Sequence, residues 1–217
     1  MSRVIMRRSG DCQLYEPARV GPSRFTTEAR AAVNRTQGEL IWFGGRPIDA
    51  LFHADCGGYT DAPENIWGTP PLAYLCARQD QVPSLVHRRW QAIVSEDALR
   101  TSLNVDARSA VGARLDSLII RTKDVSGRAA EIVAKGERTQ VFHGEDLRTL
   151  LNRVLGPKGL QSTRFTVTRR GNMFVFDGEG FGHGVGLCQL GAMARLRRGA
   201  SVEDVLNYYY PGATLGR

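Results

Sequence analysis

Short hydrophobic runs with period-two alternation dominate the chain, and they predict a strand-rich fold with few helices. The predicted strands lie at residues 39–43, 90–94, 115–122, 130–134, 139–142, 165–168 and 173–176. Apolar residues at helical spacing predict short helices at residues 26–36, 96–103, 144–155 and 202–209. Helices and strands do not alternate regularly. The pattern therefore predicts an α+β fold, a strand-rich mixed domain with about four short helices.

Capping and turn residues mark the ends of several predicted elements. Ser95 is a good N-cap residue for the helix that follows it. Gly44-Gly45 is a hairpin signal, and it predicts a returning strand at residues 48–53. Residues 63–71 are rich in proline and glycine, which predicts a loop that carries Trp67.

The central third of the chain has a pattern of its own. Residues 84–146 are β-rich, and we predict that they form a module inserted into a core domain. Residues 1–83 would then be the N-terminal part of the core, incomplete at its start, and residues 147–217 its C-terminal part. The sequence has no internal repeat and no low-complexity linker.

Composition and charge exclude several classes of protein. The chain has 217 residues, is 42% hydrophobic and 24% charged, and carries a formal net charge of +7. Apolar runs stay shorter than the roughly 18 residues that a membrane span needs, and the first residues lack the apolar core of a signal peptide. The basic residues form dispersed clusters without interleaved aromatic residues. We therefore expect no membrane span, no export signal in this chain and no nucleic-acid partner.

The densest cluster of unusual residues lies at 181–192, where four glycines accompany an imidazole, a thiol and a carboxamide. Glycine alternates with other residues from 182 to 186, so one side of this segment is bare and another backbone or a ligand can approach it. His183 and Gln189 are the polar groups beside that surface. From Gln189 the spacing becomes helical. The segment is a glycine-rich turn before a short helix, and its histidine either packs in the core or lines a cleft.

Residues 183–192 resemble the signature of the stage II sporulation protein D / amidase-enhancer family. Other segments are similar to motifs of that family in the family's order: Cys12-Gln13-Leu14-Tyr15, Cys56-Gly57-Gly58-Tyr59-Thr60, Asn65-Ile66-Trp67-Gly68 and Tyr208-Tyr209-Tyr210-Pro211-Gly212. The resemblance runs from about residue 11 to residue 215. Each motif alone is moderately specific, and five in the same order make the resemblance strong.

The resemblance implies an extracytoplasmic protein that acts on peptidoglycan. Such proteins are lytic transglycosylases that cleave glycan strands stripped of their stem peptides, or enhancers of a partner amidase. Transglycosylation with formation of a 1,6-anhydromuramyl end needs a glutamate that acts first as general acid and then as base. The family supplies it from a helix before the Cys-Gln-x-Tyr segment, and that helix has no counterpart in this sequence. We therefore expect a glycan-binding domain that is catalytically incomplete.

Two alternatives stay open. One is an active transglycosylase that uses Glu179, which lies four residues before His183. A solvated glutamate has a pKa near 4, which is low for an efficient acid at neutral pH, so Glu179 is a weak candidate. The other alternative is a non-catalytic scaffold that activates a cell-wall amidase.

The matched motifs supply the expected binding residues. Glutamine, tyrosine and tryptophan offer hydrogen bonds and stacking surfaces to a sugar chain, and the glycine-rich turns leave room for it. The expected substrate-binding residues are Gln13, Tyr15, Cys56, Gly57, Gly58, Trp67, His183, Gly184 and Gln189. The expected partners are peptidoglycan glycan strands and, in the scaffold alternative, a cell-wall amidase.

The four cysteines give no metal motif. No Cys-x-x-Cys pair occurs, and the sequence does not choose between the three pairings that four cysteines allow. Some family members carry a zinc site just before the Cys-Gln-x-Tyr segment, and only Cys12 matches such a site here. We expect no metal and no cofactor. If zinc is found, His53 and Cys56 are the first ligands to test, because they have His-x-x-Cys spacing.

Overall fold

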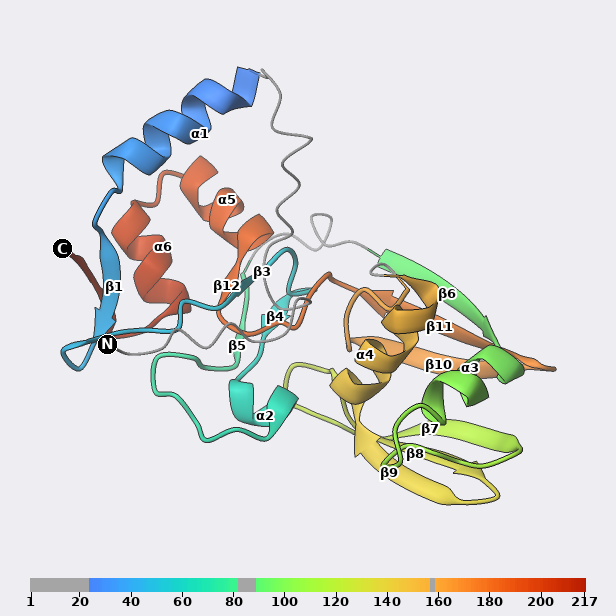
Figure 1. Cartoon of the computed structure of the whole chain (residues 1–217). Coiled ribbons are helices and arrows are strands. Elements are labelled where there is room, and N and C mark those ends of the chain that lie inside the picture. Colours follow the sequence, from blue (N-terminus) through green and yellow to red (C-terminus); the bar gives the residue numbers. More distant parts are fainter. Residues whose placement is uncertain (1–23, 82–88, 157–158) are drawn as a thin grey trace. The chain divides into compact units, whose positions relative to one another are not determined.

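The structure, a computed structural model, describes residues 24–81, 89–156 and 159–217 (Figure 1). The chain forms two compact units, residues 1–48 with 214–217 and residues 49–213. Among the described residues, no helix has the length and apolar character needed to cross a membrane. Helices and strands are mixed, with strands in several small sheets, which confirms the α+β class.

In its described residues, 24–48 and 214–217, the smaller unit has one helix and a three-stranded antiparallel sheet with the order β13-β1-β2. Gly44 and Gly45 both have positive φ and form the tight turn between β1 and β2, as the sequence predicts. Ile41 pairs with Leu215, so the C-terminal residues join this sheet. The elements are α1 (Arg24–Arg35), β1 (Leu40–Phe43), β2 (Arg46–Pro47) and β13 (Thr214–Gly216).

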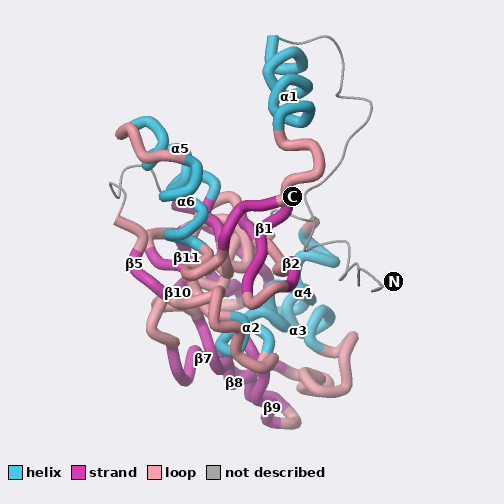
Figure 2. The backbone as a smooth tube through the Cα atoms, turned by 90° about the vertical axis from the view of Figure 1, so that its left-hand side faces the viewer, coloured by secondary structure: helices cyan, strands magenta, loops and turns pink. Residues whose placement is uncertain are grey.

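The larger unit contains two antiparallel three-stranded sheets, with the orders β10-β11-β6 and β7-β8-β9. Figures 1 and 2 show β7, β8 and β9 side by side. All six strands coincide closely with predicted ones. They are β6 (Arg89–Ser95), β7 (Leu115–Lys123), β8 (Ala129–Gly136), β9 (Thr139–His143), β10 (Phe165–Arg170) and β11 (Met173–Glu179). β6 alternates between exposed and buried positions, whereas β8 and β11 each bury three consecutive residues.

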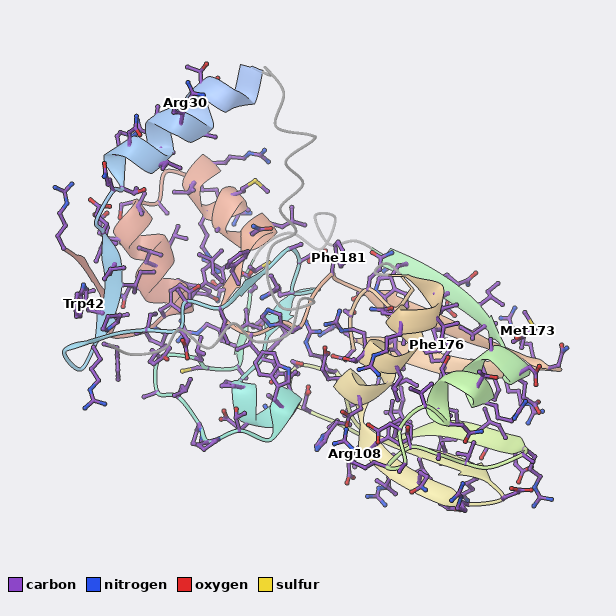
Figure 3. The ribbon with its side chains drawn as sticks, in the orientation of Figure 1. Arg30, Trp42, Arg108, Met173, Phe176 and Phe181 are labelled. Atoms are coloured by element: carbon purple, nitrogen blue, oxygen red, sulfur yellow. The ribbon has the colours of Figure 1, made fainter. Side chains whose placement is uncertain are left out.

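One hydrophobic cluster joins these sheets to α3 (Glu96–Leu103) and α4 (Gly144–Leu155). The rings of Phe165 and Phe176 meet edge to face in this cluster, with centroids 5.4 Å apart. Figure 3 shows Phe176 inside this part of the molecule and Met173 at the far end of β11. Ser95 accepts a hydrogen bond from the backbone N–H of Ala98 and caps α3, as its sequence position predicts.

The cluster extends beyond the predicted inserted module. Leu147 and Leu151 of α4 and Phe165 and Phe176 of the β10–β11 hairpin belong to it, and all four lie outside residues 84–146. The three-segment division of the chain stays a prediction.

The rest of the larger unit consists of short elements around the glycine-rich segments. β3 pairs with β12 in parallel, and β4 pairs with β5 antiparallel. α5 and α6 lie next to each other in both ribbon views (Figures 1 and 2). These elements are β3 (Phe52–His53), β4 (Tyr59–Thr60), α2 (Pro63–Trp67), β5 (Arg78–Gln79), β12 (Leu187–Cys188), α5 (Gln189–Arg197) and α6 (Val202–Tyr209).

Two local predictions are wrong. The predicted loop at 63–71 begins with a helical turn, α2, because Pro63 has the fixed φ that suits a first helical position and Gly68 ends the turn at φ 63°. Of the predicted strand at 48–53, only Phe52 and His53 form a strand, β3, which pairs with β12; the strand that returns beside β1 is β2, just before residue 48.

Candidate functional site

The two glycine-rich segments that the sequence singles out are neighbours in the structure. Cys188 of β12 lies in register with His53 of β3. Two isolated bridges add to this contact, Asp55 with Phe181 and Asp61 with Val185. Figure 3 labels Phe181, which lies on the chain between β11 and β12. The first segment therefore runs along the second over most of its length.

Glycine is required where this contact is closest. Gly184 has φ +88°, and an added Cβ would overlap the guanidinium group of Arg128. Gly186 has φ +73°, and a Cβ there would overlap the carbonyl oxygen of Leu51. The bare side of the Gly-x-Gly-x-Gly segment is thus covered by the protein itself. Close approach was predicted correctly for this segment, and the approaching groups are the chain's own backbone and Arg128.

His183 is held on both ring nitrogens. Nε2 donates to the carbonyl oxygen of Phe52 at 3.0 Å, and Nδ1 accepts from the N–H of Val185 at 3.1 Å. Burial, together with the positive charges of Arg148 and Arg128, lowers the pKa of His183 to about 3. The ring is therefore neutral. Its centroid lies 5.2 Å from that of Trp67, whose side chain is partly exposed at the end of α2.

His53 lies behind His183 and has the opposite arrangement of ring protons. The two ring centroids are 5.5 Å apart, in an edge-on geometry. Nδ1 of His53 donates to the carbonyl oxygen of Val185 at 3.1 Å. Nε2 has no hydrogen-bond partner within the described part of the chain, although the residue is only 4% exposed. Burial lowers the pKa of His53 well below its usual value, so its ring is neutral too.

Cys56 and Cys188 face each other beside His53, and both are fully buried. The backbone N–H of Cys56 donates to Sγ of Cys188 at 3.3 Å, and that of Gly58 donates to Sγ of Cys56 at 3.3 Å. Cys188 is also the N-cap of α5, where its Sγ accepts from the N–H of Gly191. The contact with Cys188 and burial raise the pKa of Cys56.

Two buried ion pairs surround these groups. Arg128 donates to the carbonyl oxygen of Cys56 at 2.9 Å, and its Nε lies 3.9 Å from Oδ2 of Asp61. Asp80 accepts from Arg195 at 2.7 Å and from the hydroxyl of Tyr209 at 2.7 Å. Each buried charge therefore has an opposite charge beside it, which offsets part of the cost of removing it from water.

The three tyrosines of the Tyr-Tyr-Tyr-Pro-Gly motif form a clamp: their hydroxyl groups bond to the segments on either side of the Cys-Gly-Gly turn. Tyr208 donates to the carbonyl oxygen of Gln79, and Tyr210 donates to that of Leu51 at 2.7 Å. Tyr209 lies against Gly191, where a Cβ would overlap its hydroxyl and the carboxylate of Asp80. These contacts join α6 to the segments before β3 and after β5.

Glu179, the weak candidate for a general acid, is bound by two arginines. Its carboxylate lies 3.4 Å from Arg89 and 3.6 Å from Arg164, and its side chain is 38% exposed. A general acid must carry a proton before the reaction. Two neighbouring cations stabilise the ionised carboxylate, so this position does not favour the role.

The predicted substrate-binding residues differ in their exposure to solvent. Trp67, Gly58 and Gln189 are partly exposed, and Gln189 begins α5. Gln13 and Tyr15 lie outside the described residues. The remaining predicted substrate-binding residues, Cys56, Gly57, His183 and Gly184, are buried.

Sequence reasoning missed the charged residues at the centre of the site, Asp61, Asp80 and Arg128. Asp61 directly follows the Cys-Gly-Gly-Tyr-Thr motif, and this was the only local signal. Asp80 and Arg128 lie outside all the matched motifs. Nothing in the sequence indicates that they are buried.

Comparison with known proteins identifies the family. Residues 77–186 match the family described as "Domain of unknown function (DUF8618)". An uncharacterized protein of Brachyspira hyodysenteriae is 31% identical over 196 residues, which are 90% of this chain and 50% of that protein. The amidase enhancer of Bacillus subtilis is 26% identical over 238 residues, 90% of this chain and 33% of the enhancer. Stage II sporulation protein D of the same organism is 29% identical over 186 residues, 85% of this chain and 50% of that protein.

The chain therefore belongs to the stage II sporulation protein D / amidase-enhancer family, as its motifs predict. It spans between 33% and 50% of the length of the curated relatives that it matches.

Proposed function

We propose that this chain binds the glycan strands of peptidoglycan through a surface centred on Trp67. The observation that carries the proposal is the contact between this partly exposed indole and the buried, neutral imidazole of His183, with ring centroids 5.2 Å apart. The names of two relatives, sporulation protein D and amidase enhancer, support a function at the cell wall.

The chemistry of Trp67 suits a sugar ligand. An indole offers a broad apolar face together with one N–H donor, and a sugar ring has apolar faces and polar edges. Ligand sites typically combine aromatic surface with a few fixed polar groups. His183 supplies support from behind, because two hydrogen bonds hold it in one orientation. A platform that is already ordered loses little conformational entropy when it binds.

The proposal assigns different roles to the residues of the two motifs. Trp67 touches the sugar, and His183 positions Trp67. Gly184 permits the close packing of the Arg128 guanidinium against the backbone next to His183. Cys56 and Gly57 form the buried turn that Arg128 holds through the Cys56 carbonyl. The buried residues of the motifs then build the platform, and the partly exposed ones meet the ligand.

Co-sedimentation with purified cell-wall glycan tests the proposal. Trp67→Ala is expected to weaken binding to glycan stripped of stem peptides by about tenfold or more, as truncation of a central aromatic contact does. Trp42→Ala is the matched control, because Trp42 is also partly exposed but belongs to the smaller unit. Equal binding by the two variants would contradict the proposal.

The name of the amidase-enhancer relative favours a second candidate function, activation of a cell-wall amidase. The two functions separate in one assay, in which a purified amidase digests intact wall with and without this chain. Faster release of stem peptides by the amidase, unchanged by Trp67→Ala, supports the activator. Binding to glycan that Trp67→Ala abolishes, without faster digestion, supports the binding domain.

A further inference from the structure

We propose that His53, Cys56 and Cys188 bind a zinc ion inside the larger unit. A ring nitrogen of His53 and the Sγ atoms of the two cysteines all lie within 4.8 Å of one another. Zinc–sulfur bonds of about 2.3 Å in a tetrahedral site place two sulfurs about 3.8 Å apart, which this spacing accommodates. Two cysteines and one histidine form a set of soft and borderline ligands that zinc prefers.

The ring of His53 is held in an orientation that leaves one nitrogen free to bind a metal ion. Metal-binding histidines typically donate one ring N–H to a carbonyl or carboxylate, which fixes the ring and leaves the other nitrogen for the metal. Nδ1 of His53 donates to the carbonyl oxygen of Val185 at 3.1 Å. Nε2 is buried and has no hydrogen-bond partner among the residues described. A buried polar atom without a partner needs an explanation, and a bound cation supplies one.

Backbone N–H groups point at both sulfurs, and the Cys56 thiol also donates to Oδ2 of Asp80 at 3.5 Å, a proton that zinc binding would displace. Sγ of Cys56 accepts a hydrogen bond from the N–H of Gly58, two residues later in the same turn. Sγ of Cys188 accepts from the N–H groups of Cys56 and Gly191. Because Cys188 is the N-cap of α5, it also lies at the positive end of the helix dipole. Backbone N–H groups directed at sulfur stabilise the negative charge that metal binding requires.

The charges of the buried groups balance when a divalent ion is present. Two thiolates and one neutral imidazole carry two negative charges, which a divalent cation neutralises. Asp61 already has Arg128 as its partner, and Asp80 already has Arg195. The ion therefore adds no unpaired charge to the interior, where an unpaired charge is costly.

This zinc site differs from the zinc site of some family members, which lies in the segment just before the position of Cys12. The sequence-based expectation of no metal rested on that segment and on the absence of a Cys-x-x-Cys pair, with His53 and Cys56 as the ligands to test if zinc were found; the structure adds Cys188 to them. Three protein ligands leave one position of a tetrahedral ion for a small ligand such as water. Zinc bound here would tie β3, the Cys-Gly-Gly turn and the start of α5 together at the point where the two glycine-rich segments meet.

Elemental analysis tests the proposal on the whole chain, purified under reducing conditions without added metal. We expect about one zinc ion per chain in the wild type and in Cys76→Ser, whose thiol lies outside the cluster. The zinc content of Cys188→Ser is expected to be lower than that of the wild type by about tenfold or more. Serine is a good N-cap residue, so this variant keeps the start of α5.

A second measurement does not depend on any variant. Removal of zinc from the wild-type chain by a strong chelator is expected to lower its melting temperature, and equimolar zinc is expected to restore it. Cobalt in place of zinc is expected to give thiolate-to-metal absorption, which Cys188→Ser lacks. The proposal is wrong if the chain is zinc-free with both thiols reactive. It is also wrong if peptide mapping shows a Cys56–Cys188 disulfide, or if Cys188→Ser retains full zinc.

Discussion

The guanidinium Nε of Arg128 lies 3.9 Å from Oδ2 of Asp61, and neither side chain is exposed to solvent. Asp61 also accepts hydrogen bonds from Asn65 and Ser126. Arg128 reaches past it to the carbonyl oxygen of Cys56. Burial lowers the pKa of Arg128, and the charge of Asp61 opposes this shift. The pair connects the β7–β8 turn to the Cys-Gly-Gly segment.

Removing the arginine alone is expected to destabilise the protein strongly. Arg128→Met leaves Asp61 charged and buried without its cation, which costs about 3–5 kcal/mol in the free energy of unfolding. Arg121→Met is the control, because the pair of Arg121 with Glu131 is exposed to solvent, where an ion pair adds little to stability. Urea denaturation measures both. The double variant Asp61→Asn, Arg128→Met is expected to recover part of the loss, and similar small effects of the two single arginine variants would contradict the account.

Gly184→Ala is expected to destabilise the protein more than Gly171→Ala. Both glycines have positive φ, so both variants strain the backbone. A Cβ at Gly171 meets nothing within 4 Å, whereas a Cβ at Gly184 overlaps the guanidinium of Arg128. The overlap is expected to add about 1–3 kcal/mol to the cost. Thermal unfolding of the two variants compares them directly, and equal melting temperatures would show that Arg128 does not pack there.

Much of the fold follows from local sequence signals. The six long strands of the larger unit coincide with short hydrophobic runs in the sequence, and Ser95 marks the start of α3. The pairing of Phe52 and His53 is different, because β3 pairs with β12, far away in the sequence. No local pattern encodes such a pairing.

In the candidate site, too, some features have local sequence signals and others depend on distant parts of the chain. The glycine-rich motifs were recognised, and the structure brings them together. Their burial was not predicted, since the groups that cover them come from elsewhere: Arg128 from the β7–β8 turn, and Tyr209 from the last helix. An arginine in a polar turn ordinarily points to solvent. Only the tertiary structure shows that this one is directed inward.

Tyr209→Phe is expected to cost more stability than Tyr208→Phe. The hydroxyl of Tyr209 donates to the buried carboxylate of Asp80, and its loss leaves a charged acceptor with one donor fewer. We expect a cost of about 1–3 kcal/mol. The hydroxyl of Tyr208 donates to the carbonyl oxygen of Gln79 near the surface, where water replaces it. Chemical denaturation distinguishes the two variants, and the reverse order would contradict the clamp.

Glu179→Gln is expected to leave any glycan-cleaving activity of this chain unchanged. The carboxylate is an ion-pair partner of Arg89 and Arg164 rather than a proton donor. Release of anhydromuramyl products from glycan without stem peptides measures this, with Glu131→Gln, another arginine-paired surface glutamate, as the control. Turnover that disappears in Glu179→Gln alone would instead make Glu179 the general acid.

The most direct test of the glycan-binding proposal uses the three tryptophans of the chain as internal probes. Soluble glycan oligosaccharides without stem peptides are titrated into the isotopically labelled protein, and the indole N–H resonances are followed by NMR. The account predicts that the signal of Trp67 shifts, while those of buried Trp90 and of Trp42 in the smaller unit stay in place. Saturable shifts of Trp42 or Trp90 with an unmoved Trp67 signal, or no shift at any of the three, would contradict it.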